Sequence, residues 1–246
     1  MHCPPNAGSG GDDTVDSHDP VAIAAVHAIR TGDTASLAAL LSEHPGLASE
    51  QIHETRTPLH VVADWPGYFP AGPAIVRLLI EAGADPNTDS GGNRPETPLH
   101  WAGSSDDADV ADALISGGAD LETPGGSIGT PLDNAVGYGC CNVARLLVQR
   151  GAQVDKLWHA AAVGIMPRFE ELLAATPAPS TDDINEAFWQ ACHGGQRRAA
   201  ERLLASGADL NATPGYSDQT PAEAAADPGT QRENLVTWLH DRKQAT

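Results

Sequence analysis

The sequence predicts an all-α fold in which short helix pairs repeat along the chain. Four versions of one phrase carry this prediction: Thr-Pro-Leu-His at Thr57 and Thr97, Thr-Pro-Leu-Asp at Thr130 and Thr-Pro-Ala-Glu at Thr220. A glycine-alanine pair follows both Thr97 and Thr130 after 21 residues, so the spacing recurs as well as the phrase. Apolar residues make up 41% of the chain but aromatic residues only 4%, which favours closely packed helices with alanine-rich and leucine-rich cores.

Each phrase has the chemistry of a helix start. Pro98 suits a first helical turn because its missing N–H would have no partner there, and the Thr97 hydroxyl can cap the helix. Leu99 and Ala102 are three residues apart, which places them on one helix face, turned toward the neighbouring repeat. The glycine 21 residues later, Gly118, can take the left-handed conformation that ends a helix.

The first two repeats depart from this pattern. A helix pair is predicted from Val21 to His44 without the phrase, which is typical of a terminal repeat with one face in solvent. In the second repeat Gly83 follows Thr57 after 26 residues, an insertion of five. The insertion lies within Trp65–Pro73, where prolines and glycines exclude a helix but three aromatic residues also occur.

The last three repeats differ in other ways. Only Gln153–Asp155 separates the fourth repeat from the fifth, in which Trp158 replaces the histidine of the phrase. In the sixth, Trp189 replaces that histidine and Glu186 the threonine. The seventh repeat starts at Thr220 and ends in polar residues, which suits a C-terminal cap.

Turn-forming residues predict projecting loops between repeats. These predicted fingers are His53–Arg56, Thr88–Glu96, Thr123–Gly129, Thr181–Asn185 and Thr213–Gln219. We further expect a disordered acidic tail over residues 1–19, one repeat domain over 20–241 and a polar end over 242–246.

The phrase Thr97-Pro98-Leu99-His100-Trp101-Ala102 matches T-P-L-H-x-A, so the chain resembles the ankyrin-repeat family over about residues 21–240. The resemblance implies a solenoid of about seven helix-turn-helix repeats with β-turn fingers, whose first and last repeats are divergent caps. It also implies a non-enzymatic module that holds a partner protein in its concave groove and finger loops.

The net charge indicates which kinds of partner to expect, and the cysteine content indicates the cell compartment. A net charge of −19 repels phosphate, so we expect no nucleic acid and no membrane as partners. The acidity either serves solubility alone or indicates that the protein partner is basic. The spacing of the four cysteines does not suggest a disulfide framework, and there is no apolar leader or long apolar run, which together predict a cytoplasmic protein. We expect a monomer.

The sequence contains no recognisable catalytic or metal-binding constellation, and we expect no cofactor. His60 and His100 occupy the signature position and should bond within and between repeats, since no H-x-x-x-H or Cys/His cluster accompanies them. The pairs Asp106-Asp107 and Asp182-Asp183 fall at predicted helix starts, where a carboxylate complements the helix dipole.

In the ankyrin pattern, the two positions after the paired alanines of each first helix face the groove. Aromatic residues there and in adjoining loops are candidate binding anchors, although Trp65 and Phe69 could instead fold back over the inserted loop. The candidate contact residues are Asp64, Trp65, Tyr68, Arg94, Ser104, Ser105, Tyr138, His193 and Tyr216.

A second hypothesis is a small-molecule binder or an enzyme on the same scaffold. The aromatic Trp65–Pro73 loop could then cover a pocket, and the irregular junction at Gln153–Asp155 could open a cleft. A closed pocket under that loop would favour this hypothesis, whereas an open strip would favour protein binding.

Overall fold

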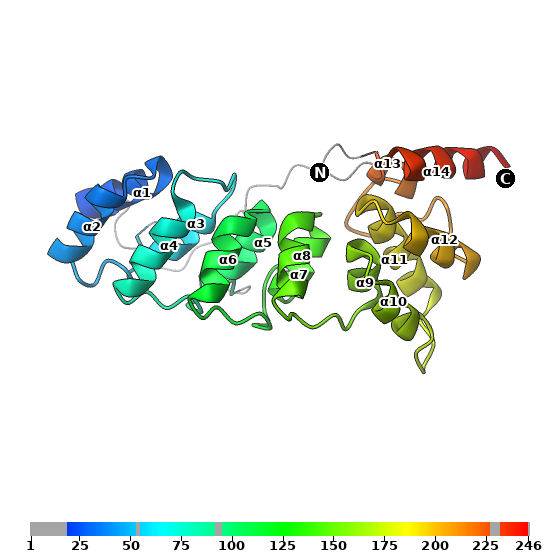
Figure 1. Ribbon diagram of the computed structural model, residues 1–246, viewed down its shortest axis with the longest axis horizontal. Coiled ribbons are helices and arrows are strands. Elements are labelled where there is room, and N and C mark those ends of the chain that lie inside the picture. Colours follow the sequence, from blue (N-terminus) through cyan, green and yellow to red (C-terminus); the bar gives the residue numbers. More distant parts are fainter. Residues whose placement is uncertain (1–18, 53–54, 92–94, 227–231, 246) are drawn as a thin grey trace. The chain divides into compact units, whose positions relative to one another are not determined.

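The computed structural model describes residues 19–52, 55–91, 95–226 and 232–245. These residues form helices joined by turns, with no β-strand among them, which confirms the predicted all-α class (Figure 1). They divide into two compact units, one ending at Ala152 and the other beginning at Gln153. The division falls where the sequence lacks the usual long turn between repeats.

Seven helix pairs are present in the described residues, in agreement with the predicted number of repeats. The N-terminal unit holds the pairs α1 (Pro20–Thr31) and α2 (Thr34–Glu43), α3 (Pro58–Ala63) and α4 (Gly72–Glu81), α5 (Pro98–Ser105) and α6 (Ala108–Ser116), and α7 (Pro131–Gly137) and α8 (Cys141–Gln149). The C-terminal unit holds the pairs α9 (Leu157–Val163) and α10 (Met166–Leu173), α11 (Thr181–His193) and α12 (Arg197–Ala205), and α13 (Pro221–Ala224) and α14 (Glu233–Ala245).

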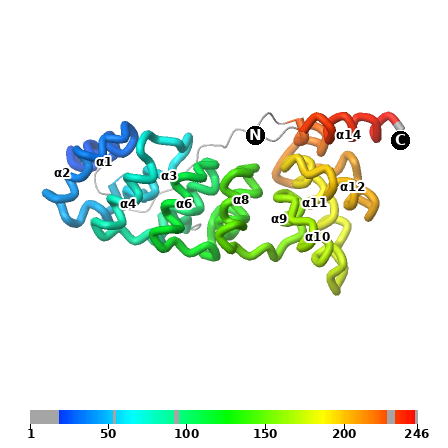
Figure 2. Tube along the Cα trace, viewed as in Figure 1, coloured from blue at the N-terminus to red at the C-terminus, as the bar shows by residue number. Residues whose placement is uncertain are grey.

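Helices of the same kind stack within the N-terminal unit (Figure 2). The first helices follow the order α1, α3, α5, α7, and the second helices the order α2, α4, α6, α8. Leu59, Leu99 and Leu132, which follow the proline of each phrase, are buried between neighbouring repeats. The predicted burial of Leu99 is therefore confirmed.

The C-terminal unit has a core of its own. Phe169, Phe188, Leu203 and Leu235 are buried together in one cluster, with contributions from α10, α11, α12 and α14. In this unit α11 packs on both α9 and α12, and it also contacts α13. Each unit thus buries its apolar faces between adjacent helix pairs, as repeat proteins do.

The signature histidines join neighbouring repeats. The backbone N–H of Thr97 donates to Nδ1 of His100 at 3.1 Å, so the ring proton lies on Nε2, which donates to the Gly129 carbonyl oxygen at 3.0 Å. His60 donates in the same way to the carbonyl oxygen of Glu96 at 2.9 Å. The predicted bonding role of both histidines is confirmed.

Burial keeps these histidines neutral. Desolvation lowers the pKa of His60 from 6.5 to about 4. The same cause lowers the pKa of His100. A neutral ring is what the bonding pattern needs, because Nδ1 has to accept while Nε2 donates.

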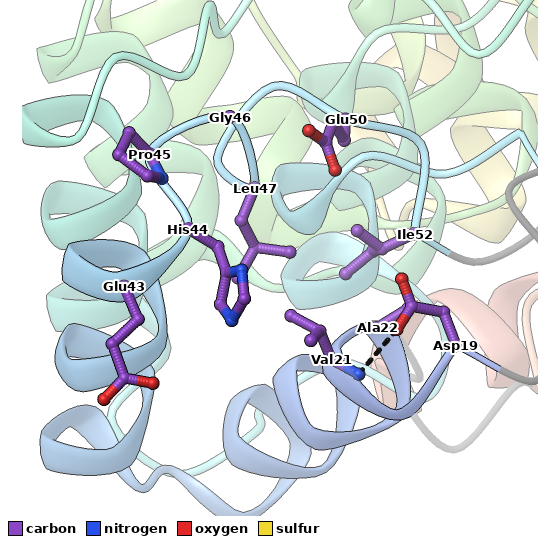
Figure 3. Close-up of a pocket in the computed structure, with 10 residues that line it drawn as sticks. All are labelled: Asp19, Val21, Ala22, Glu43, His44, Pro45, Gly46, Leu47, Glu50 and Ile52. Carbon is purple, nitrogen blue, oxygen red and sulfur yellow. Dashed lines mark hydrogen bonds between the residues drawn. The ribbon is translucent and has the colours of Figure 1, made fainter.

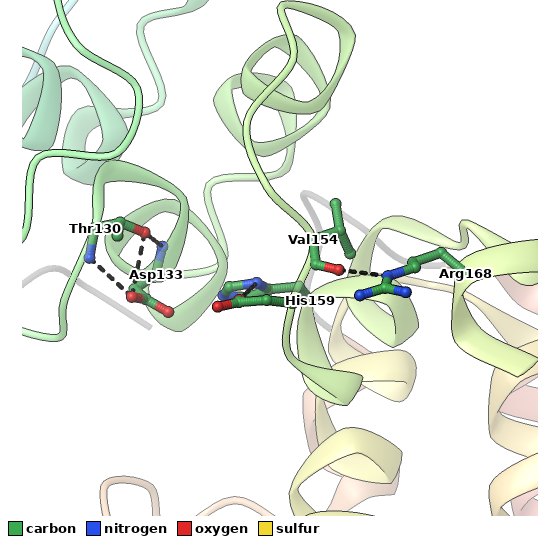
Figure 4. A network of polar contacts seen from close by, with 6 residues as sticks. Thr130, Asp133, Val154, His159 and Arg168 are labelled. Atoms are coloured by element: carbon green, nitrogen blue, oxygen red, sulfur yellow. Dashed lines mark hydrogen bonds and ion pairs between the residues drawn. The ribbon is translucent and has the colours of Figure 1, made fainter. Parts of the chain in front are cut away.

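Carboxylates take the histidine's capping role elsewhere. In the fourth repeat Asp133 accepts from the backbone N–H of Thr130 at 2.8 Å (Figure 4). In the sixth, Ser180 and Asp183 form the same reciprocal cap, with Ser180 N–H donating at 2.8 Å. The finger predicted at Thr181–Asn185 is therefore wrong, because this cap starts α11 early and those residues are helical.

Candidate partner-binding surface

The inserted loop between α3 and α4 spans residues 64–71. Gly72 and Pro73 already belong to α4, so the predicted non-helical stretch is two residues too long at its end. Proline is tolerated there because it lies in the first helical turn. In the loop Gly67 has φ of +73°, and a Cβ on it would lie 3.2 Å from Ser105.

Backbone strain is concentrated at this loop. Tyr68 and Ala71 both have φ of +56°, and Asp106, the residue to which Tyr68 bonds, has φ of +57°. Among the described residues these three are the non-glycine positions with left-handed backbone. Such residues cost energy and persist where surrounding contacts fix them, which is common at functional sites.

Two aspartates of the third repeat fix the loop. The backbone N–H of Tyr68 donates to the Asp107 carboxylate at 2.5 Å, and its hydroxyl donates to the Asp106 carbonyl oxygen at 2.6 Å. Asp107 also accepts from the backbone N–H of Val110 at 3.0 Å, which caps α6. Tyr68 is therefore held at both ends, by its backbone and by its hydroxyl.

The Asp106 side chain extends the same connection to the fourth repeat. Its carboxylate accepts from the backbone N–H groups of Asn142 at 2.9 Å and Val143 at 3.0 Å, at the start of α8. Burial raises the pKa of Asp106, and the bonds from Asn142 and Val143 oppose that rise. The predicted position at a helix start is confirmed for Asp107, which caps α6. Asp106 instead ends α5, and neither its bonds to α8 nor the attachment of the loop was predicted.

The aromatic side chains of the loop remain accessible. Trp65 is 60% exposed and Tyr68 is 59% exposed, while Phe69 is half-buried. Trp65 therefore does not fold back over the loop. Partial desolvation of the Tyr68 hydroxyl raises its pKa, and the nearby carboxylates of Asp106, Asp107 and Asp109 raise it further. The exposed phenol thus lies in a negative potential.

Asp64 ends α3 next to Trp65. Its carboxylate lies 3.6 Å from the guanidinium of Arg56, which in turn lies over the ring of Trp101 at 5.2 Å. The contact orients Asp64 beside the loop. We refer to Asp64, Trp65, Tyr68 and Asp109 as the loop surface.

The other predicted residues of the N-terminal unit have different environments. Ser105 is buried, and its hydroxyl donates to the Ala63 carbonyl oxygen at 3.0 Å, so it serves packing between repeats rather than a groove. Ser104 is half-buried and bonds within its own helix. Tyr138 is half-buried, with its hydroxyl 2.9 Å from Ser127 Oγ. Arg94 lies outside the described residues.

Two predicted residues belong to the C-terminal unit. His193 is only 5% exposed and stacks on Trp189 with ring centroids 5.1 Å apart, so it is a packing residue. The Tyr216 ring is half-exposed, and its hydroxyl accepts from Gln190 Nε2 at 2.9 Å. The hydroxyl also bonds Glu186, and its burial raises the Tyr216 pKa.

The fifth repeat has its own polar contacts near its first helix. Arg168 donates from Nε to the Val154 carbonyl oxygen at 2.8 Å, which ties α10 to the segment before α9 (Figure 4). His159 is buried in α9, with Nδ1 3.5 Å from Asp155. These contacts position the start of α9 within the C-terminal unit.

A pocket is present, but not under the inserted loop. It lies in the first repeat, beside the start of α1 (Figure 3). The inserted loop instead packs closely on the turn between α1 and α2. If Gly32 in that turn carried a Cβ, this atom would lie only 2.6 Å from the Pro70 carbonyl oxygen of the loop.

Among the described residues no group of three or more His, Cys, Asp and Glu side chains could hold a metal ion. None of the described helices combines the length and hydropathy needed to cross a membrane.

Comparison with known proteins identifies the repeats. Residues 68–156 match the family model for ankyrin repeats, in three copies. The "Ankyrin repeat and KH domain-containing protein mask-1" of Caenorhabditis elegans is 28% identical over 160 residues, which cover 61% of this chain and 6% of that protein. The crystal structure of the Bcl-3 ankyrin repeat domain aligns with 94% of this chain and 100% of its own, at 24% identity and a TM-score of 0.50. The chain carries ankyrin repeats and has the ankyrin-repeat fold.

Proposed function

We propose that this chain is a non-enzymatic protein-binding module whose partner contacts the loop surface. The observation that carries the proposal is Tyr68, which is 59% exposed yet fixed at both its backbone N–H and its hydroxyl. A side chain that is already ordered loses little conformational entropy on binding. Trp65 on the same loop adds a second accessible aromatic, and such residues often supply about 2 kcal/mol or more each at interfaces.

Charge supports a basic partner. The chain carries a net charge of −19, and Asp106, Asp107 and Asp109 place a negative potential at the Tyr68 ring. Lysine and arginine side chains are attracted both to such carboxylates and to aromatic faces. Electrostatic attraction of this kind speeds association and weakens as salt increases.

The proposal also includes further contact residues, the oligomeric state and the cell compartment. Ser104 and Tyr138 are partly exposed and would extend the contact along the N-terminal unit. Arg94, which lies outside the described residues, stays a contact residue predicted from sequence. Tyr216 would provide a separate contact in the C-terminal unit. We propose a monomeric, cytoplasmic protein that binds no nucleic acid, as its charge and cysteine usage indicate.

Quantitative affinity capture of the full chain from its native cells tests the proposal. Wild type and the Trp65→Ala, Tyr68→Ala and Ile23→Ala variants would be compared by mass spectrometry. Ile23 is 54% exposed in α1 and serves as the control for loss of an exposed apolar side chain. We expect wild type and Ile23→Ala to capture the same partner proteins. The amount of these proteins captured by Trp65→Ala should be at least tenfold lower than with wild type. Equal enrichment by all four forms would contradict the proposal.

A further inference from the structure

Gln190 in α11 is a buried amide whose oxygen lacks a donor. The residue is 1% exposed, and its Oε1 atom has no hydrogen-bond partner among the described residues. Its Nε2 donates to the Tyr216 hydroxyl at 2.9 Å, and the hydroxyl in turn bonds the Glu186 carboxylate. Because the hydroxyl proton goes to Glu186, the amide has to present Nε2 to Tyr216. Burying the unpaired Oε1 destabilises the free protein.

The fourth repeat shows which donor is missing. Asn134 in α7 occupies the same place as Gln190 in α11, since each precedes an alanine that is followed by glycine after four residues. Asn134 Oδ1 accepts from the backbone N–H of Ile128 at 3.1 Å, in the loop that precedes α7. In the sixth repeat α11 already starts at Thr181, so the corresponding residues are helical. Gln190 therefore lacks the donor that such a loop supplies.

Glu186 adds a second acceptor beside Gln190. The two residues are four apart in α11 and so lie on one face of the helix. Burial raises the pKa of Glu186 and Asp183 raises it further, although Lys156 and Tyr216 act in the opposite direction. Its surroundings therefore do not fully compensate this carboxylate. A positively charged group with several donors would satisfy both acceptors.

We infer that Glu186 and Gln190 receive an arginine side chain from a protein partner. A guanidinium is planar and carries five N–H donors, so it can bond the Glu186 carboxylate and still donate to Gln190 Oε1. The Tyr216 ring is 51% exposed and belongs to the loop over residues 213–219. When this side chain turns toward solvent the guanidinium reaches the amide, and it stacks on the aromatic ring.

This inference rests on the proposed function, because it takes the arginine from a basic protein partner. It assigns a partner group to the separate contact at Tyr216. The arginine site lies within the C-terminal unit, whereas the loop surface lies within the N-terminal unit. A result that removes the arginine site therefore leaves partner capture through Trp65 untouched.

Nuclear magnetic resonance of the ¹⁵N-labelled full chain tests this inference at low salt. The probe is a capped pentapeptide with one arginine between glycines, and its matched control has citrulline, which keeps the shape of the side chain and removes the charge. We expect the arginine peptide to shift the side-chain amide signals of Gln190 in a saturable way. The indole signal of Trp189, whose ring lies 5.9 Å from that of Tyr216, should shift as well. The citrulline peptide should bind at least tenfold more weakly.

Two variants separate binding from stability. Gln190→Met keeps the length of the side chain and removes the unpaired oxygen, so the Kd for the arginine peptide should rise about fivefold. Its thermal stability should not fall, because loss of the bond to Tyr216 is offset by loss of the buried unpaired acceptor. Glu186→Gln, at a half-buried position, should raise the Kd about five- to tenfold. Asp241→Asn, at an exposed position in α14, should leave the Kd unchanged.

Four results would each overturn the inference. Equal binding of the arginine and citrulline peptides would mean that the site does not select charge. A shift of the Trp65 indole signal without a shift at Gln190 would place the arginine on the loop surface. An unchanged Kd in both Gln190→Met and Glu186→Gln would show that neither acceptor is used. Tighter binding of free guanidinium ion than of the arginine peptide would assign the site to a small cation instead of a protein side chain.

Discussion

The indole nitrogen Nε1 of Trp189 donates a hydrogen bond to the carbonyl oxygen of Gln219 at 2.8 Å. Gln219 directly precedes the capping Thr220 of the next repeat, just as the acceptor residue Glu96 directly precedes Thr97. A tryptophan in the histidine position therefore makes the same bond to the next repeat. The sixth repeat keeps this link although its sequence has lost the signature.

Replacing Trp189 tests the combined contribution of this bond and of the buried indole ring to stability. Trp189→Phe removes the donor and leaves the Gln219 carbonyl without it, so we expect the free energy of unfolding to fall by about 1–3 kcal/mol. Urea denaturation followed by circular dichroism measures the change. Trp65→Phe, at an exposed position, is the control and should change stability by less than about 0.5 kcal/mol. Equal, small effects of both substitutions would show that the bond does not stabilise the fold.

Leu99 tests the packing between repeats. It is fully buried in α5, so Leu99→Ala should leave a cavity and destabilise the protein by about 2–5 kcal/mol. The exposed Ile23 provides the matched control, since Ile23→Ala removes apolar atoms without forming a cavity. An unchanged urea midpoint for Leu99→Ala would mean that the helix register is wrong.

His60 predicts a dependence of stability on pH. Its pKa is about 4 in the folded protein, below the 6.5 of an exposed histidine, so the unfolded chain takes up a proton first as the pH falls. The stability due to neutral His60 is therefore present above pH 6.5 and is lost as the pH falls from about 6.5 to 4. Urea unfolding of wild type and His60→Gln across this range measures the contribution. The same slope in both proteins would contradict it.

Asp106 should control both the loop and the start of α8. Asp106→Ala removes the acceptor for two backbone N–H groups and places alanine at a φ of +57°, so we expect a loss of about 1–2 kcal/mol. Asp106→Asn should cost less, because asparagine tolerates this backbone and retains one acceptor. Hydrogen exchange should show faster exchange of the loop over residues 64–71 in Asp106→Ala alone. Unchanged exchange there would mean that the Asp106 side chain is not needed to hold the backbone carbonyl to which Tyr68 donates.

The repeat signature made most of the fold predictable from sequence. A threonine, a proline and a leucine in order determine where a first helix starts and which face it buries, as at Thr97 and Leu99. The prediction failed at Thr181–Asn185, because Ser180 and Asp183 form an earlier cap that competes with the turn propensity of these residues. The local sequence shows both the possible cap and the turn-forming residues, but it does not show which of the two is stronger.

The candidate surface was only partly predictable. The insertion and its aromatic residues were visible in the sequence, including Trp65 and Tyr68. Ser105 and His193 occupy pattern positions of the groove, but contacts with adjacent helices bury them. The attachment of Tyr68 to Asp106 depends on left-handed backbone at two non-glycine residues, for which the sequence carries no direct signal.

Site-directed photo-crosslinking tests the central claim most directly. A benzophenone amino acid would replace Trp65 in one full-length protein and Ile23 in another, and both would be irradiated in native cells. The loop-surface account predicts a covalent adduct with a basic protein from position 65 and none from position 23. An adduct from position 23 alone, or none from either position, would contradict it.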